Sequence, residues 1–264
     1  MCRILLCNYK GFVKLEGIYG VEKMLDFLER NCGGHGNGYM VIKDKKIKSI
    51  NKGVKLTNHK IYSKVSGKPM DYFIYHTRVT SAGSVSNKNC HPFWNKNKSF
   101  ALCMNGTEQS MAAIGRKLDK TDTEIVFDMI NRSIIPLKAL GFLSANYMGF
   151  RNEKVFVVNN NRYNCLEVYQ DGDAFVIAST FPKDFPVDTK DMELTTWYEG
   201  EDIPVREPII FQNNCDNNSN FYCYDAPIPK GWKGVYTYKK ARPETIDFTK
   251  EDIYKEILKE EYEK

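Results

Sequence analysis

The sequence predicts an α+β fold in which two sheets are stacked and helices lie outside them. Three observations predict this fold: short apolar runs come first, two helical segments then follow one another, and apolar runs return afterwards. This order differs from the regular strand–helix alternation of a doubly wound parallel sheet. The chain has 264 residues, of which 42% are hydrophobic and 27% charged, so it can form one globular domain with a large core.

The first part of the chain contains short apolar runs bounded by Gly, Asn or charged residues, which is typical of buried strands. We expect four such strands, over residues 2–6, 39–42, 72–75 and 100–104. An amphipathic helix is expected over 20–30, because apolar residues recur there at helical spacing. These residues are Val21, Met24, Leu25 and Leu28.

The middle of the chain predicts two consecutive helices. Residues 107–118 form the first, and a capping-box pattern at 121–124 begins the second, which we expect to run to the neighbourhood of Pro136. Three further strands follow, separated by the turn signals 159–161 and 171–173. They are expected over 154–159, 165–169 and 174–179.

The last part of the chain differs in composition. Residues 212–220 are polar and typical of a loop, and residues 249–262 predict a terminal amphipathic helix. We therefore expect one domain over 2–200. A C-terminal extension over 201–264, consisting of a loop and the terminal helix, is expected to pack on that domain or on a partner.

Charge and composition argue against several functional classes. The net charge of +5 arises from scattered residues, and the densest basic run, over 43–55, indicates a solvated loop or strand edge rather than a nucleic-acid surface. No apolar stretch approaches about 18 residues, and the N-terminus lacks the pattern of a signal peptide. We expect a cytoplasmic protein with no nucleic-acid or membrane partner.

The eight cysteines indicate neither a disulfide framework nor a metal site. None of them forms a Cys-x-x-Cys pair, and the pair Cys32-Gly-Gly-His35 has no second pair to complete a metal site. In a cytosolic chain most cysteines are reduced and buried. We therefore expect no bound metal.

Cys2 directly follows Met1, and a small residue at this position allows the initiator methionine to be removed. Removal would leave a thiol and a free α-amino group on the same carbon. An unperturbed α-amino group titrates near ~7.7–8.0, so it is a suitable base for the thiol at neutral pH. Cys2 is therefore a candidate N-terminal nucleophile that needs no separate histidine. A Met-Cys start alone is a weak signal.

Further polar motifs follow in a fixed order along the chain. They are residues 32–38 (CGGHGNG), 76–83 (HTRVTSAG), 89–92 (NCHP), 104–106 (MNG) and 122–124 (DTE). Each has a structural alternative: Arg78 could form a structural ion pair, Asn105-Gly106 a hairpin turn, and Asp122 a helix cap. His76 and His91 are interpreted as structural residues. Only the joint occurrence of the motifs favours a functional site.

Taken together, these motifs resemble the class II glutamine amidotransferase (glutaminase) domain, a member of the N-terminal nucleophile (Ntn) hydrolases. The resemblance covers roughly residues 2–180. It implies a four-layer αββα sandwich of two stacked, mainly antiparallel sheets flanked by helices. It also implies an enzyme that hydrolyses the side-chain amide of L-glutamine through a cysteine thioester, giving glutamate and ammonia without a cofactor. Val79 and Met104 depart from the family pattern without removing a charge or donor.

The resemblance also implies a role for each site residue. Cys2 would be the nucleophile and, through its α-amine, the base, and Asn105 and Gly106 would form the oxyanion hole. Arg78 would bind the α-carboxylate of the substrate and Asp122 its α-ammonium group. Two hydroxyl residues complete the expected substrate-binding set, namely Thr80 and Ser81.

Only about 80 residues follow the matched region, and they contain no phosphate-binding motif. We therefore expect ammonia to be passed to a separate synthase protein. Two alternatives remain open: a stand-alone hydrolase of another γ-glutamyl amide, and a catalytically silent relative that binds glutamine. The sequence identifies neither the ammonia acceptor nor the pathway.

Overall fold

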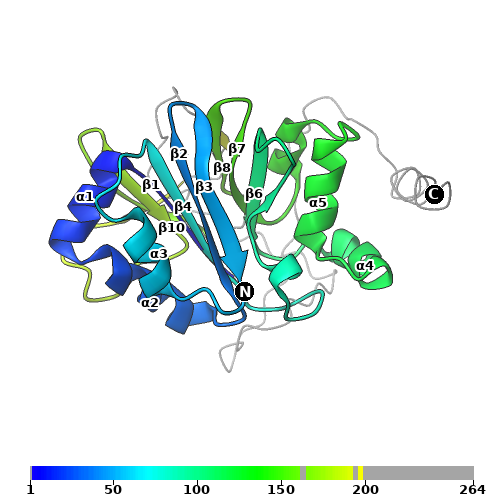
Figure 1. The fold of residues 1–264 in the computed structure, drawn as a ribbon, viewed down its shortest axis with the longest axis horizontal. Helices are drawn as coiled ribbons and strands as arrows, with labels where there is room; N and C mark the ends of the chain where they lie inside the picture. Colours follow the sequence, from blue (N-terminus) through cyan, green and yellow to red (C-terminus); the bar gives the residue numbers. More distant parts are fainter. Residues whose placement is uncertain (1, 161–164, 193–195, 199–264) are drawn as a thin grey trace, which may run out of the picture. The chain divides into compact units, whose positions relative to one another are not determined.

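The computed structural model describes residues 2–160, 165–192 and 196–198 (Figure 1). Its strands form a seven-stranded sheet in the order β11-β9-β10-β1-β4-β2-β3 and a five-stranded sheet in the order β12-β8-β7-β6-β5. All their pairings are antiparallel. The expected C-terminal extension, including the loop 212–220 and the helix 249–262, lies outside the described residues and stays a prediction.

The strands of the first sheet are β1 (Arg3–Asn8), β2 (Asn37–Lys43), β3 (Lys46–Gly53), β4 (Tyr72–Thr77), β9 (Glu167–Asp171), β10 (Ala174–Ala178) and β11 (Lys190–Asp191). Those of the second are β5 (Phe93–Trp94), β6 (Phe100–Asn105), β7 (Asn146–Arg151), β8 (Lys154–Val158) and β12 (Thr196–Tyr198). The helices are α1 (Tyr9–Ile18), α2 (Val21–Cys32), α3 (Asn58–Val65), α4 (Gln109–Leu118) and α5 (Asp122–Asn131), with two 3₁₀ helices, η1 (Asn87–Asn89) and η2 (Leu137–Phe142).

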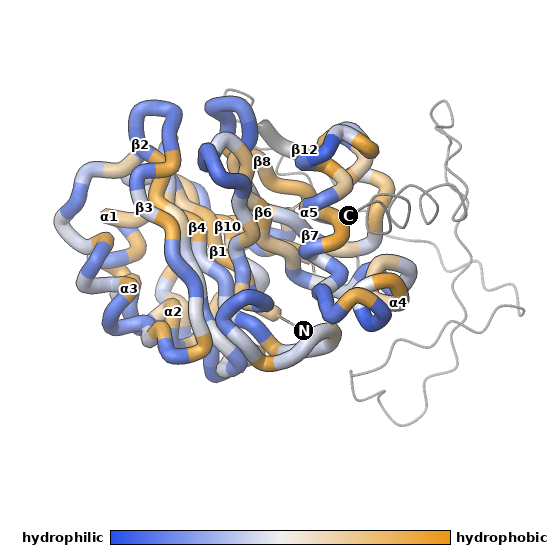
Figure 2. The backbone as a smooth tube through the Cα atoms, turned by 45° about the vertical axis from the view of Figure 1, so that its right-hand side comes forward, coloured by the Kyte–Doolittle hydropathy of each residue, from blue (hydrophilic) through white to orange (hydrophobic). Residues whose placement is uncertain are grey.

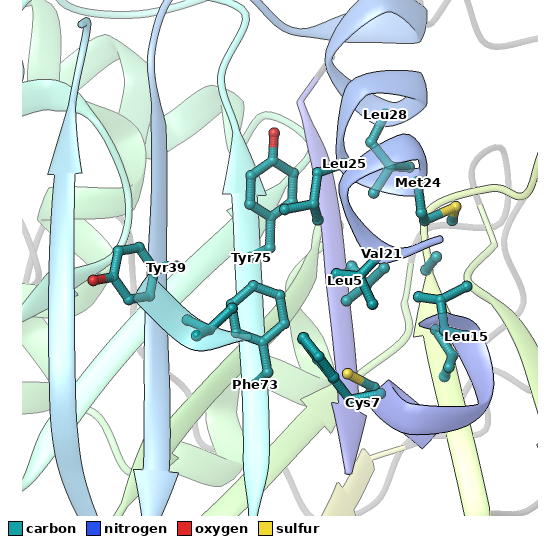
Figure 3. Close-up of a cluster of buried hydrophobic side chains, with 14 of the residues drawn as sticks. Leu5, Cys7, Leu15, Val21, Met24, Leu25, Leu28, Tyr39, Phe73 and Tyr75 are labelled. Atoms are coloured by element: carbon teal, nitrogen blue, oxygen red, sulfur yellow. The ribbon is translucent and has the colours of Figure 1, made fainter. Parts of the chain in front are cut away.

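Strand β1 shows how the layers are built, because successive side chains of a strand point to opposite faces of its sheet. Leu5 and Cys7 belong to a buried cluster that also contains residues of α1, α2 and α3. Figure 3 shows them among side chains of α2 and β4. Ile4 and Leu6 belong to a second buried cluster, which is formed with residues of β6, β7 and β8. The first sheet therefore has helices on one face and the second sheet on the other.

Helices α4 and α5 form the fourth layer. Helix α5 packs against β5 and β6 of the second sheet, and α4 packs against α5. The rings of Phe127 and Phe100 stack across this contact with their centroids 4.9 Å apart. Figure 2 shows hydrophobic residues on the strands and hydrophilic residues in the β2–β3 connection. The order helix, sheet, sheet, helix confirms the predicted αββα sandwich.

The second predicted helix ends earlier than expected. Helix α5 stops at Asn131 instead of continuing to the neighbourhood of Pro136. Ser133 has a φ of +62°, and the N–H of Ile134 donates to the carbonyl of Met129 at 2.9 Å. A left-handed residue with such a backward hydrogen bond is a common helix ending.

The sequence left two interpretations of the basic run 43–55 open, a solvated loop or a strand edge. The structure supports the second, because the run lies along the edge of a sheet. Most of it forms β3, which is the last strand of the seven-stranded sheet. Within the described ranges, no helix is long and apolar enough to cross a membrane.

Candidate active site

Cys2 lies immediately before β1, between two strands of its sheet. The register pairs Arg3 with Thr77, so Cys2 meets the residues that follow β4. Its Sγ donates to the carbonyl of Val79 at 3.5 Å. The residue is 7% exposed, and burial raises the pKa of its thiol to about 11. The thiol is therefore protonated at neutral pH and needs a base before it can attack.

Arg78 is the first residue after β4, and it is 2% exposed. Its Nη1 donates to the carbonyl of Ser84 at 2.9 Å and its Nη2 to that of Ala82 at 2.7 Å. Among the described residues, no carboxylate lies within ion-pair distance of it. The alternative of a structural ion pair is therefore not supported in this part of the chain. A buried positive charge held by neutral carbonyls is suited to binding an anion.

The glycine-rich segment 32–38 lies beside the residues that follow β4. His35 N donates to the carbonyl of Arg78 at 2.9 Å, and Arg78 N donates to the carbonyl of Gly36 at 2.8 Å. The N–H of Thr80 donates to His35 Nδ1 at 2.9 Å. The buried Oγ1 of Thr80 has no hydrogen-bond partner among the described residues. Ser81 is exposed, and its Oγ accepts from Thr107 Oγ1 at 3.4 Å.

Asn105 is the last residue of β6 and is fully buried. Its Nδ2 donates to Ser179 Oγ at 3.1 Å. The same Ser179 oxygen accepts from the N–H of Ile4 at 2.8 Å, so Asn105 is tied to the backbone two residues after Cys2. Gly106 follows with a φ of +136°, which glycine adopts readily. The pair leads from β6 towards α4, so the alternative of a hairpin turn is wrong.

Asp122 begins α5 and is 4% exposed. The cap of this helix is its neighbour Thr121, whose hydroxyl accepts from Glu124 N at 3.0 Å. The Oδ2 of Asp122 instead accepts from Glu108 N at 3.1 Å, and its Oδ1 accepts from Thr123 N at 3.0 Å. Burial raises the pKa of Asp122 to about 6, against the effect of these backbone donors. The carboxylate is therefore fixed beside the loop that follows Gly106.

The structure brings the seven sequence-predicted residues into one region through segments that are far apart in the chain. Cys2 contacts the segment 79–84, which in turn contacts Thr107. The loop 106–108 then reaches Asp122. Cys2 is also close enough to two buried charges for both to act on the pKa of its thiol: Asp122 raises it and Arg78 lowers it. The region thus combines a thiol, a cation and an anion.

His76 and His91 have structural surroundings, as the sequence interpretation expects. Their rings lie 4.0 Å apart, and His76 Nε2 lies 3.2 Å from the carbonyl of Met104. Burial lowers the pKa of His76 to about 3 and that of His91 well below its ordinary value. Both rings are therefore neutral near pH 7. Within the described ranges, no three His, Cys, Asp or Glu side chains are grouped to hold a metal.

Sequence reasoning missed three residues that support the site: Ser179, Glu108 and Asn89. Glu108 is a buried carboxylate that accepts from Ser144 N, Ala145 N and Tyr147 Oη. Ser179 stood unremarked at the end of an expected strand. Asn89 belonged to a noted motif, but nothing in the sequence indicated its contact with the segment 79–84.

The fold is an αββα sandwich of the Ntn-hydrolase type, and it has counterparts among solved structures. One is glutamine phosphoribosylpyrophosphate amidotransferase from B. subtilis in complex with ADP and GMP, with a TM-score of 0.50 and 19% identity. Another is described as the allosteric regulatory enzyme of purine biosynthesis, with a TM-score of 0.50 and 21% identity. Each comparison covers 68% of this chain.

This chain spans only 42% of the length of these two structures. Neither a protein-family model nor a curated protein matches the sequence. The comparisons therefore confirm the fold that the motifs predicted, at an identity too low to carry over the activity or the residue roles.

Proposed function

We propose that the protein is a glutamine amidotransferase of the class II type, which releases ammonia from the side-chain amide of L-glutamine. One observation carries the proposal: the buried thiol of Cys2 contacts Val79, next to the buried Arg78, and both Arg78 and the buried Asp122 act on the pKa of that thiol. A cation and an anion near a nucleophile suit a substrate that carries both an α-carboxylate and an α-ammonium group.

Substrate binding follows from these two charges. Arg78 has donors beyond the two that Ala82 and Ser84 occupy, and a guanidinium can hold a carboxylate with two parallel hydrogen bonds. Asp122 accepts from the α-ammonium group once its carboxyl is ionised. Thr80 is proposed to offer its hydroxyl, which has no hydrogen-bond partner among the described residues, and Ser81 is proposed to offer an exposed one. Both charges fix the free amino-acid end, so that the side-chain amide reaches Cys2.

The proposed chemistry requires the removal of Met1, because only then is the nitrogen of Cys2 an amine. The amine takes the thiol proton as Sγ attacks the amide carbonyl carbon. Donation by Asn105 Nδ2 and the Gly106 N–H stabilises the resulting oxyanion, a contribution worth about 10²–10³ in rate per donor. The carbon–nitrogen bond then breaks, and the amine passes its proton to the leaving group to give ammonia. Water hydrolyses the γ-glutamyl thioester to glutamate and regenerates the thiol.

The proposed acceptor of ammonia is a separate synthase protein. The two solved structures of similar fold are matched by this chain over 42% of their own length. Residues 2–200 are proposed to form the glutaminase domain and 201–264 the extension that packs on it or on the partner. We propose a cytoplasmic location and no metal or cofactor for the hydrolysis.

The test combines the intact mass of the purified protein with glutamate release from L-glutamine. The wild-type protein is expected to lack the mass of Met1 and to release glutamate, and Cys2→Ala is expected to release none. Cys7→Ala is the matched control, because Cys7 lies at the other end of β1 and faces the core beneath the helices, and it should retain full activity. A wild-type protein that keeps Met1 in its native cell would contradict the mechanism.

Two further outcomes distinguish the alternatives. Turnover of another γ-glutamyl amide in place of glutamine would identify a stand-alone hydrolase. Glutamine binding without turnover, measured by calorimetry, would identify a silent relative. Glutamate release that rises when a candidate synthase and its acceptor are added would support the two-protein arrangement.

A further inference from the structure

Asn89 and Arg78 share a hydrogen-bond acceptor. Asn89 Nδ2 donates to the carbonyl of Ser84 at 2.9 Å, and Arg78 Nη1 donates to the same oxygen at 2.9 Å. Asn89 Nδ2 also lies 3.2 Å from Ser84 Oγ. The side chain of Asn89 is fully buried, whereas Ser84 is exposed, so Asn89 reaches Ser84 from the protein interior. The position of one carbonyl oxygen is therefore defined by two donors at once.

The same side chain restricts the backbone beside Ser84. Gly83 has a φ of +70°, and a Cβ at this position would lie 2.9 Å from Asn89 Nδ2 and 3.2 Å from Thr121 Cγ2. The backbone at Gly83 thus packs closely against Asn89 and against Thr121, the residue that precedes Asp122. Both carbonyls that hold the guanidinium of Arg78, those of Ala82 and Ser84, belong to this confined segment.

Asn89 is itself held in place by its surroundings. It ends the 3₁₀ helix η1, and its N–H donates to the carbonyl of Ser86 at 3.2 Å. Asn87 joins η1 to the chain after β3, because its Oδ1 accepts from Val54 N at 2.9 Å. Cys90 Sγ donates to Ser86 O at 3.4 Å. The turn that contains Asn89 is therefore fixed, and the hydrogen bond from Asn89 to Ser84 holds the segment 82–84 against it.

We propose that Asn89 is a positioning residue that sets the orientation of the Arg78 guanidinium for the substrate α-carboxylate. The inference rests on the proposed function for the identity of that carboxylate. A guanidinium has five N–H donors in a rigid plane, so the carbonyls that occupy two of them decide where the others point. Without the Asn89 amide, the segment 82–84 gains freedom and the guanidinium must be oriented by the substrate during binding. The loss appears in KM, because the α-carboxylate is remote from the bond that breaks.

The kinetic test compares L-glutamine with L-glutamine α-amide, in which a neutral carboxamide replaces the α-carboxylate. For L-glutamine, Asn89→Ala is expected to raise KM about tenfold and to leave kcat within about twofold. For the α-amide, wild type and variant are expected to have the same kcat/KM within about twofold. An equal loss of kcat/KM for both substrates would overturn the proposal, because a general structural defect does not distinguish them.

Two further variants control this comparison. Lys88→Ala removes an exposed ion pair with Asp119 from the same turn without touching Ser84 or the hydrogen bonds that fix η1, and it should leave both substrates unaffected. Asn89→Asp keeps the size of the side chain but cannot donate to Ser84, so it should raise the KM for L-glutamine as well. It serves as the test variant if circular dichroism shows Asn89→Ala to be unfolded. An unchanged KM in Asn89→Asp would overturn the proposal.

A spectroscopic experiment tests the role of Asn89 independently of whether the protein hydrolyses glutamine. In protein labelled with ¹⁵N-arginine, the Hη protons of Arg78 are expected to exchange slowly with solvent, and Arg78→Lys assigns their signals. Asn89→Ala should accelerate this exchange at least about fivefold, as expected when an ordering hydrogen bond is lost. If the wild-type protein neither binds nor hydrolyses glutamine but Asn89→Ala accelerates the exchange of the Arg78 protons, only the proposed function fails. Unchanged exchange overturns the role of Asn89 whatever the enzyme does with glutamine.

Discussion

Asn105 and Ser179 join the two sheets of the fold through a buried hydrogen bond of 3.1 Å between Nδ2 and Oγ. Asn105 ends β6 of the five-stranded sheet, and Ser179 directly follows β10 of the seven-stranded sheet. The Ser179 hydroxyl also holds the N–H of Ile4 at 2.8 Å. The expected oxyanion donor and the strand that begins beside Cys2 are therefore fixed by one oxygen atom.

Removing the Ser179 hydroxyl should impair turnover more than binding. In Ser179→Ala the amide of Asn105 loses its anchor, and a typical hydrogen bond contributes about 1 kcal/mol. We expect kcat for glutamine to fall about fivefold or more, with KM within about twofold, in steady-state assays of glutamate release. Thr180→Ala is the matched control and should behave as wild type. A Ser179→Ala enzyme with unchanged kcat would exclude this positioning role.

Glutamine affinity should fall below about pH 6. Burial raises the pKa of Asp122 to about 6, so the carboxylate that accepts from the α-ammonium group is lost as the pH drops through that value. Titration calorimetry with the inactive Cys2→Ala protein should show affinity about tenfold weaker at pH 5 than at pH 7, the change expected for one proton per pH unit. Asp122→Asn should bind weakly at both pH values, and Asp171→Asn, remote from the site, should retain the pH dependence.

Acid should weaken the fold through His76. Its pKa is lowered by burial from 6.5 to about 3, so between these values the unfolded chain binds a proton that the folded protein excludes. The free energy of unfolding therefore decreases as pH falls below 6.5, by about 1.4 kcal/mol per unit and about 2 kcal/mol by pH 5. Urea unfolding of His76→Gln should show a pH dependence smaller by that amount. An unchanged pH dependence would contradict the neutral buried ring.

Gly106→Ala should affect both stability and catalysis. A side chain at a φ of +136° is strained, at a cost of about 1–3 kcal/mol. The variant should unfold at lower urea concentration, and its kcat should fall more than about tenfold because the N–H expected in the oxyanion hole moves. Gly67→Ala is a matched control for strain alone, since Gly67 has a φ of +70° with open space around it. Equal activities of the two variants would contradict the role of Gly106.

The sequence was sufficient to predict the fold class and most strands, because their signals are local. Helix α1 escaped prediction because Gly11 and Gly17 lower its helix propensity. Its tertiary environment stabilises it, and Asn8 caps it through a hydrogen bond from Gly11 N at 2.7 Å. Strand β7 was missed because Gly149 interrupts its apolar pattern. A Cβ there would lie 2.3 Å from the carbonyl of Ala101, so packing between neighbouring strands requires the glycine.

The candidate site was predictable to the extent that its residues sit in short motifs. Arg78, Asn105 and Asp122 each belong to such a motif, whereas Ser179 acts through partners in two other strands that adjoin it only in the folded chain. Asn89 was visible in the sequence, but its role depends on sharing the Ser84 carbonyl with Arg78. Contacts of this kind have no sequence period or spacing from which they could be inferred.

The hydrogen bond between Ile4 and Ser179 joins residues that are 175 positions apart in the chain. During synthesis the surroundings of Cys2 therefore stay incomplete until the ribosome has added those residues, which takes roughly 10–35 s at about 5–20 residues per second. Throughout that interval the start of the chain is accessible to an aminopeptidase. The long range of this contact would thus leave time for the proposed removal of Met1 before the folded protein buries Cys2.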